Sequence, residues 1–216
     1  MIYRQKANNI KLKAPRFFKF YCPNHQYHMR ALLIIIALIA ITICRGVEVK
    51  RTLASLSQAR WNMGATAAGN YALFGGGRLN DDFFGDRSLT KVVDIFDSIS
   101  KTWTTANLSK VIEGPAATSV GKYAFFAGVL GPDSRQILDI FDSSTGQWTV
   151  SQLETFFCDL AVSVGKYALF ASQRRVVVFD STTLQIVMTT NFSLPRARMA
   201  AASAGKYALF AGGRTL

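Results

Sequence analysis

Histidine is nearly missing from this chain of 216 residues: there are two, His25 and His28, and none follows. Without an imidazole, residues 29–216 cannot carry a Ser-His-Asp or Cys-His catalytic group. They also lack the side chain that most often binds transition metals. We therefore expect no catalytic residue, no metal site and no cofactor site there, and an enzyme is the less favoured class.

Cysteine is scarce as well, at three residues: Cys22, Cys44 and Cys158. Removal of the first 46 residues would leave Cys158 alone, with no partner for an internal disulfide. Its neighbours Phe157 and Leu160 are apolar. The sequence therefore predicts a buried structural thiol at this position, since a reactive cysteine needs an electropositive, accessible setting.

Acidic residues are absent from positions 1–46, which hold eight Lys and Arg and so carry +8 of the net +12. The rest of the chain has 17 Lys and Arg against 13 Asp and Glu, a net +4. A basic chain normally suggests nucleic acid. Here most of the charge flanks an apolar run, which indicates membrane targeting, and we expect no nucleic-acid partner.

The apolar run is residues 31–44, ALLIIIALIAITIC, between Arg30 and Arg45. As a helix it would be about 21 Å long, against roughly 30 Å of bilayer hydrocarbon. One interpretation is the core of a cleaved signal peptide that starts at Met29. The other is a signal-anchor transmembrane helix behind a basic tail, residues 1–30, with its N-terminus in the cytoplasm. A buried core segment is the third alternative.

Both of the first two interpretations send residues 47–216 into the secretory pathway, as a secreted or a membrane-anchored single-pass protein. Two Asn-x-Ser sequons, at Asn107 and Asn191, would then be candidate N-glycosylation sites. If the segment 31–44 is not cleaved, the membrane itself is a partner of the chain.

An internal repeat dominates residues 47–216. A phrase Gly-x-Tyr-Ala recurs four times and a phrase ending in Phe-Asp three times, the first two of these followed by Trp. The residues that define the repeat are Gly69, Tyr71, Phe96, Asp97, Trp103, Gly121, Tyr123, Phe141, Asp142, Trp148, Gly165, Tyr167, Phe179, Asp180, Gly205 and Tyr207. The tyrosines recur in all four units, so we expect them to pack, and the aspartates recur in register in three units, so we expect them to bond within turns.

Each unit consists of short apolar runs separated by turn residues, which predicts strands and no helices. In the first unit we expect four strands, a to d, at Gly64–Ala68, Tyr71–Gly75, Val92–Asp97 and Trp103–Ala106. Four strands that repeat every 40 to 52 residues are typical of a propeller blade. Nearly all variation in repeat length falls between strands b and c, so we expect the variable loops at one end of the blades.

The first unit carries Leu56 and Arg60 before strand a, a glycine run at 75–77, and the Phe96-Asp97…Trp103 phrase. This pattern resembles the kelch repeat, a family of β-propellers. The predicted fold is therefore all-β: a kelch-like propeller over 47–216, preceded by a single apolar helix. It would have about three complete four-stranded blades and a partial one, near residues 60–106, 112–150, 156–190 and 196–216.

Kelch propellers usually have six or seven blades, so the resemblance implies that this one is closed by oligomerisation or by further blades. It also implies a comparison with galactose oxidase, whose propeller is similar. That enzyme's copper needs His and Tyr ligands, and the repeats here contain no histidine. The carboxylates Asp81 and Asp82 lie in one polar loop and are interpreted as solvated.

Recognition is the function that remains. We predict a secreted or membrane-tethered, non-catalytic module that binds a protein or a glycan. The alternative is a piece of a larger propeller enzyme, a hydrolase or an oxidase, whose active site lies outside this chain. The candidate ligand face collects arginines, a tryptophan and two carboxylates at the loop-bearing end: Arg60, Trp61, Arg78, Asp81, Asp82, Arg198 and Arg214.

Overall fold

The structure is a computed structural model and describes residues 53–79, 88–128, 136–153 and 158–215. The chain divides into two compact units, Met1–Ser55 and Leu56–Leu216. All described strands belong to the second unit. The helix expected at 31–44, the basic tail and the loop with Asp81 and Asp82 lie outside the described residues.

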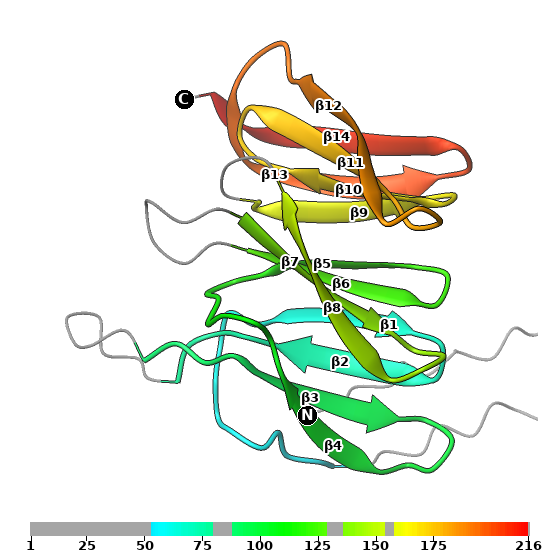
Figure 1. Cartoon of the computed structure of the whole chain (residues 1–216). Coiled ribbons are helices and arrows are strands. Elements are labelled where there is room, and N and C mark those ends of the chain that lie inside the picture. The colour runs from blue at the N-terminus through cyan, green and yellow to red at the C-terminus, as the bar shows by residue number, and fades with distance from the viewer. Residues whose placement is uncertain (1–52, 80–87, 129–135, 154–157, 216) are drawn as a thin grey trace, which may run out of the picture. The chain divides into compact units, whose positions relative to one another are not determined.

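The described part of the second unit contains fourteen strands and no helix, which confirms the all-β prediction (Figure 1). They form three four-stranded antiparallel sheets and one two-stranded sheet, each ordered as the chain runs. We call them blades 1 to 4. Blade 1 is β1 (Gly64–Ala68), β2 (Tyr71–Gly75), β3 (Val92–Asp97) and β4 (Trp103–Asn107). Blade 2 is β5 (Ala116–Val120), β6 (Tyr123–Gly128), β7 (Gln136–Asp142) and β8 (Gln147–Leu153).

Blade 3 is β9 (Leu160–Val164), β10 (Tyr167–Ala171), β11 (Arg175–Asp180) and β12 (Gln185–Asn191). Blade 4 has β13 (Arg196–Ala204) and β14 (Tyr207–Thr215). The first three strands predicted for blade 1 match the observed bounds, and the fourth extends one residue further, to Asn107.

The repeated Gly-x-Tyr-Ala phrase is the hairpin turn from the first to the second strand of each blade. In blade 1, Ala68 pairs with Tyr71, so Gly69 and Asn70 are the two turn residues. Gly69 has a φ of 55°, a conformation that glycine adopts without steric cost. The glycines at the same place in the other blades have nearly the same φ, so one local rule builds all four hairpins.

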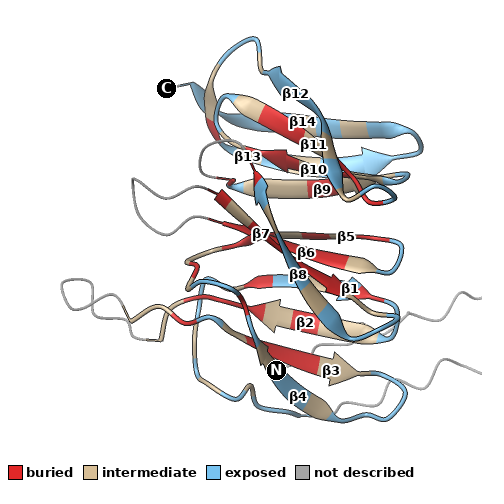
Figure 2. Cartoon of the chain, in the orientation of Figure 1, coloured by how far each residue is buried: buried red, intermediate tan, exposed pale blue. Residues whose placement is uncertain are grey.

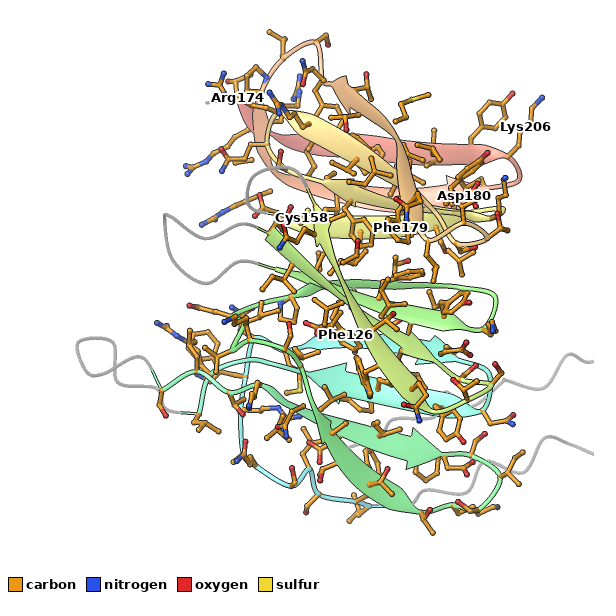
Figure 3. All side chains as sticks on the ribbon, viewed as in Figure 1. Phe126, Cys158, Arg174, Phe179, Asp180 and Lys206 are labelled. Atoms are coloured by element: carbon orange, nitrogen blue, oxygen red, sulfur yellow. The ribbon has the colours of Figure 1, made fainter. Side chains whose placement is uncertain are left out.

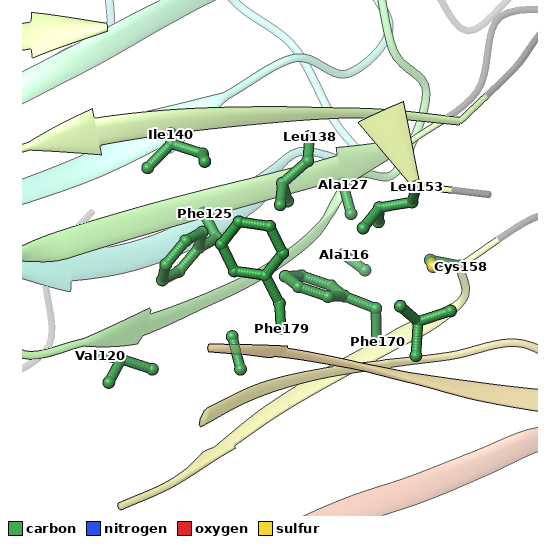
Figure 4. Close-up of a cluster of buried hydrophobic side chains, with 12 residues drawn as sticks. Ala116, Val120, Phe125, Ala127, Leu138, Ile140, Leu153, Cys158, Phe170 and Phe179 are labelled. Atoms are coloured by element: carbon green, nitrogen blue, oxygen red, sulfur yellow. The ribbon is translucent and has the colours of Figure 1, made fainter. Parts of the chain in front are cut away.

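The blades pack through their first strands: β1 contacts β5, β5 contacts β9, and β9 contacts β13. Two apolar clusters fill the spaces between the blades. One joins blades 1 and 2, and includes Leu73, Phe126 and Phe141. The other joins blades 2 and 3, around Phe125 and Phe179 (Figure 4). Burial follows this arrangement, since the buried stretches run through the sheets of blades 1 to 3 while blade 4 is mostly exposed (Figure 2).

The connection between the second and third strands varies in length, as the repeat predicts. It spans residues 76–91 in blade 1, 129–135 in blade 2 and 172–174 in blade 3. The strands that flank it keep a regular register in each blade. Packing between blades therefore fixes the strands, and the loops at this end are free to differ.

Candidate binding face

Trp61 and Arg78 form the centre of the candidate face, at the end of blade 1 where β1 begins and β2 ends. Their backbones pair, with N–H to O distances of 3.0 and 2.9 Å. The Arg78 guanidinium carbon lies 5.3 Å from the centroid of the Trp61 ring, a cation–π contact. Arg78 Nε also lies 3.3 Å from Oε1 of Glu113, which precedes blade 2.

This group is accessible. Trp61 is 43% exposed, and the Arg78 and Glu113 side chains are 20% and 33% exposed. An aromatic ring beside a guanidinium and a carboxylate offers an apolar surface with donors and acceptors at its border. Trp and Arg are also the residues that most often anchor protein interfaces.

The glycine run explains how these side chains come together. Gly77 has a φ of 102°, and a Cβ built on it would lie 2.5 Å from the carbonyl oxygen of Trp61. Its N–H donates to the carbonyl of Ile112 at 2.9 Å, which ties blade 1 to the segment before blade 2. Only glycine permits this close approach, so the run positions Trp61, Arg78 and Glu113 together.

Arg60 is a member of the predicted face, but its side chain lies inside blade 1 and is 0% exposed. Its Nη2 donates to the Phe74 carbonyl at 2.9 Å and lies 2.6 Å from Oδ2 of Asp94. The other carboxylate oxygen of Asp94 accepts the Ser57 N–H at 2.9 Å. Arg60 therefore holds the start of blade 1 against β2 and β3, and a ligand in solvent cannot contact its guanidinium.

Arg198 and Arg214 lie in blade 4, at the matching end of its sheet. Both are exposed, and Arg214 pairs with Ala197, the residue before Arg198. Arg198 has a φ of 60°, and neither it nor Gly213 opposite has a partner in the strand register, so the pairing is interrupted there without a shift in register. Figure 3 shows many nitrogen-tipped side chains at this end, Arg174 among them. Arg198 and Arg214 form a second group, in blade 4.

Glu113 is the member of the face that the sequence analysis missed. Aligning the repeats by Gly69 and Gly121 places it at the position of Trp61. It could have been found by asking which residues of neighbouring units share a repeat position. Asp81 and Asp82, which the sequence analysis included, lie outside the described residues.

No protein-family model matches this sequence, and no curated protein is significantly similar to it. Within the described ranges there is no group of three or more His, Cys, Asp or Glu side chains placed to hold a metal ion. The same ranges contain no helix long and apolar enough to cross a membrane.

The recurrent aspartates bond within turns, as predicted. Oδ1 of Asp142 accepts the N–H of Ser144 at 2.9 Å, and Oδ1 of Asp180 accepts that of Thr182 at 2.8 Å. Lys122 Nζ lies 2.7 Å from Oδ2 of Asp142, and its hydrogen bond, followed by that of Ser144, lowers the Asp142 pKa to about 2. The same arrangement with Lys166 lowers the Asp180 pKa to about 2.

Cys158 is buried at the edge of the cluster between blades 2 and 3, as the sequence predicts (Figure 4). Burial raises the pKa of its thiol to about 12. A thiol that stays protonated is a poor nucleophile, so its setting favours a packing role for Cys158.

The two sequon asparagines occupy matching places. Asn107 ends β4 and Asn191 ends β12, the outermost strands of blades 1 and 3, and both are exposed. A glycan on either would project from the same end of its blade, the end that carries the variable loops.

Proposed function

We propose that residues 47–216 form a kelch-like propeller module of the secretory pathway that binds a protein or a glycan and catalyses no reaction. Residues 31–44 deliver it there, either as a cleaved signal peptide or as a single-pass anchor with a cytoplasmic tail. The kelch assignment is supported by the glycine run and by the Phe-Asp…Trp phrase at equivalent places in blades 1 and 2. Oligomerisation or additional blades would complete the closed ring of blades that a propeller forms.

The observation that carries the binding function is the partly exposed group of Trp61, Arg78 and Glu113. It combines a partly exposed indole ring, a guanidinium stacked on it and a carboxylate, on a backbone fixed by glycines. Its members come from blade 1 and from the segment before blade 2, so blade packing preorganises it. Preorganised aromatic and arginine anchors are what a recognition site requires.

The test is to probe arrays of immobilised oligosaccharides and of secreted proteins with the full chain in mild detergent. The Trp61→Ala and Arg78→Met variants should no longer bind the oligosaccharides or proteins on the array that the wild-type chain binds. Tyr207→Ala is the matched control, because Tyr207 is 60% exposed in blade 4 and lies apart from the group. Equal binding by wild type and Trp61→Ala would exclude this face.

The secretory assignment has its own test. Expression in a eukaryotic cell should give a protein whose mobility shifts after enzymatic removal of N-glycans. Asn107→Gln and Asn191→Gln should each remove one step of that shift. A protein that stays unglycosylated in the cytosol would contradict the secretory assignment. The proposal for the binding face would not be affected by this result.

The alternative is that these blades belong to a larger propeller enzyme. Its active site would lie outside this chain, because Asp81 and Asp82 lie in one polar loop and are interpreted as solvated. Hydrolysis of a panel of chromogenic glycosides by a longer form of the protein, with none by residues 47–216, would favour the enzyme over the binding module.

A further inference from the structure

An arginine recurs at one repeat position, at the end of the second strand, in three of the four blades. Arg78, Arg174 and Arg214 each follow the turn glycine of their unit by nine residues. The Arg78 side chain is 20% exposed although blade 2 packs beside blade 1. Arg174 is exposed although blade 4 packs beside blade 3. This position therefore stays accessible in a blade that has a following neighbour.

The glutamate that neutralises Arg78 is replaced between blades 3 and 4. Glu113 precedes blade 2, and its Oε1 lies 3.3 Å from Arg78 Nε. At the repeat position of Glu113, the segment that follows blade 3 has Ala197, and the next residue is Arg198. Arg174 is thus the counterpart of Arg78 beside an alanine and a second arginine. Neither Arg174 nor Arg198 has an ion pair in the described part of the chain.

Main-chain contacts gather Arg174, Arg198 and Arg214 at the junction of blades 3 and 4, and we call these three residues the junction group. The N–H of the first residue of β13 donates to the carbonyl of Gln173, the residue before Arg174, at 2.9 Å. Arg214 lies opposite Ala197, the residue before Arg198, in the pairing of β13 with β14. The three arginines therefore share the loop-bearing end of the two blades, where nitrogen-tipped side chains gather (Figure 3).

The charges of blades 3 and 4 are separated between the two ends of the strands. Residues 158–216 contain five arginines, two lysines and two acids. All five arginines lie at the loop-bearing end, whereas Lys166 and Lys206 lie in the hairpin turns at the opposite end. Asp180 also lies at that opposite end, 2.7 Å from Lys166 Nζ. Asp159 is then the acid of this stretch that shares the end of the junction group, so the charges of the stretch give this end a positive potential.

We propose that the junction group binds a sulfated polysaccharide. Each guanidinium offers a planar fork of N–H donors that bonds two oxygens of one oxyanion, which an ammonium group cannot do. Three arginines spread over two blades fit a polymer with successive anionic groups better than one small anion. The proposal rests on the proposed secretory address, because a chain in the secretory pathway meets anionic polysaccharides. It gives this end of blades 3 and 4 a ligand that does not require the Trp61 group.

The probe is a fluorescently labelled heparin decasaccharide, and its binding to the full chain in mild detergent is followed by fluorescence polarisation. Arg174→Gln, Arg198→Gln and Arg214→Gln should each weaken binding roughly fivefold, and the triple variant should weaken it by more than about thirtyfold, because each removes a charge-assisted contact. Lys206→Gln is the matched control. It removes the same charge from the same pair of strands at the opposite end, so it should change the affinity by less than about twofold.

Equal losses with Arg214→Gln and Lys206→Gln would show that binding follows net charge alone and would overturn the proposal. A triple variant that binds like the wild type would also overturn it, because the basic tail, present in every protein compared, would then hold the heparin.

Two further probes test the choice of ligand. A hyaluronan decasaccharide, which carries carboxylates and no sulfates, should bind the wild type at least about tenfold more weakly than heparin. Hyaluronan that binds as tightly as heparin would overturn the preference for sulfate. Single-stranded DNA or phosphatidylserine vesicles that bind as tightly, and lose binding with the same substitutions, would overturn the choice of a polysaccharide.

This measurement can fail separately from the tests of the proposed function. It uses the purified chain, so its result does not depend on the glycosylation test of the secretory address. Trp61→Ala should leave heparin binding unchanged, and a loss with this variant equal to that with Arg174→Gln would overturn the assignment to the junction group. Circular dichroism of each variant shows that the blades remain folded, and the three single substitutions test the group independently.

Discussion

The ring of Tyr71 meets the ring of Phe141 edge-on, with 5.5 Å between centroids and an interplanar angle of 89°. Tyr71 belongs to β2 of blade 1 and Phe141 to β7 of blade 2. Blade 1 thus places the tyrosine of its second strand against the third-strand phenylalanine of blade 2. A related contact joins blades 2 and 3, where Phe125, two residues after the tyrosine position, has its ring centroid 5.7 Å from that of Phe179.

The first prediction compares two tyrosines at the same repeat position. Tyr71→Ala should lower the free energy of unfolding by about 2–3 kcal/mol, because it removes a packed ring between two blades. Tyr207 is 60% exposed, so Tyr207→Ala should change the free energy of unfolding by less than about 0.5 kcal/mol. Denaturant unfolding of both variants decides this. Equal losses would mean that the tyrosines stabilise their own hairpins and not the contact between blades.

The repeat predicts most of the fold because its signals are local. A glycine with positive φ at each turn and apolar strand-length runs fix the hairpins without any long-range information. Tyr207 differs from the other three tyrosines, since it is 60% exposed and no described strand of a further blade packs on it. Packing between blades is a long-range relationship that no local pattern supplies.

The candidate face was harder to predict. Arg60 and Trp61 are adjacent in sequence, yet Arg60 is enclosed by β2 and β3, where it contacts Phe74 and Asp94, while Trp61 is exposed. Glu113 reaches Arg78 through the packing of blade 2 on blade 1. Side-chain partners separated by 34 or more residues leave no periodic signal along the chain.

The second prediction concerns the buried ion pair. Arg60→Met leaves the Asp94 carboxylate buried without a cation and should cost about 3–5 kcal/mol of stability. The double variant Arg60→Met, Asp94→Val should recover most of that loss. Blade 3 supplies the precedent, because Val177 occupies the aspartate position there and is buried at 3% exposure. The readout is the unfolding midpoint of the three proteins, and a double variant as unstable as the single one would contradict the argument.

The third prediction is a pH dependence set by the turn aspartates. The pKa of Asp142 falls from 3.8 to about 2 in the folded chain, so its contribution to stability is complete above pH 4 and is lost as the pH falls towards 2. Lys122, whose pKa is raised by the same pair, loses its contribution only above pH 10.5. Lys122→Met should therefore flatten the stability profile at both ends. Unfolding measured between pH 2 and 5 should show a smaller loss of stability on acidification in this variant than in the wild type. Lys101 is an exposed lysine in another turn, so Lys101→Met is the control and should leave the pH dependence unchanged.

The last prediction tests whether blades 2 and 3 stay closed around Cys158. With a pKa of about 12, about one thiol in ten thousand is ionised at pH 8, and the cluster also shields the sulfur from reagent. In a Cys22→Ser, Cys44→Ser variant, Cys158 should react with a disulfide reagent at least about a hundredfold more slowly than free cysteine does. Its rate should rise with denaturant in step with the loss of circular dichroism, because exposure requires the two blades to separate. Rapid labelling of a fully folded chain would contradict this prediction, because it would show that the two blades separate without unfolding. Tyr123→Ala removes a ring packed against the same cluster and should therefore increase the labelling rate of Cys158.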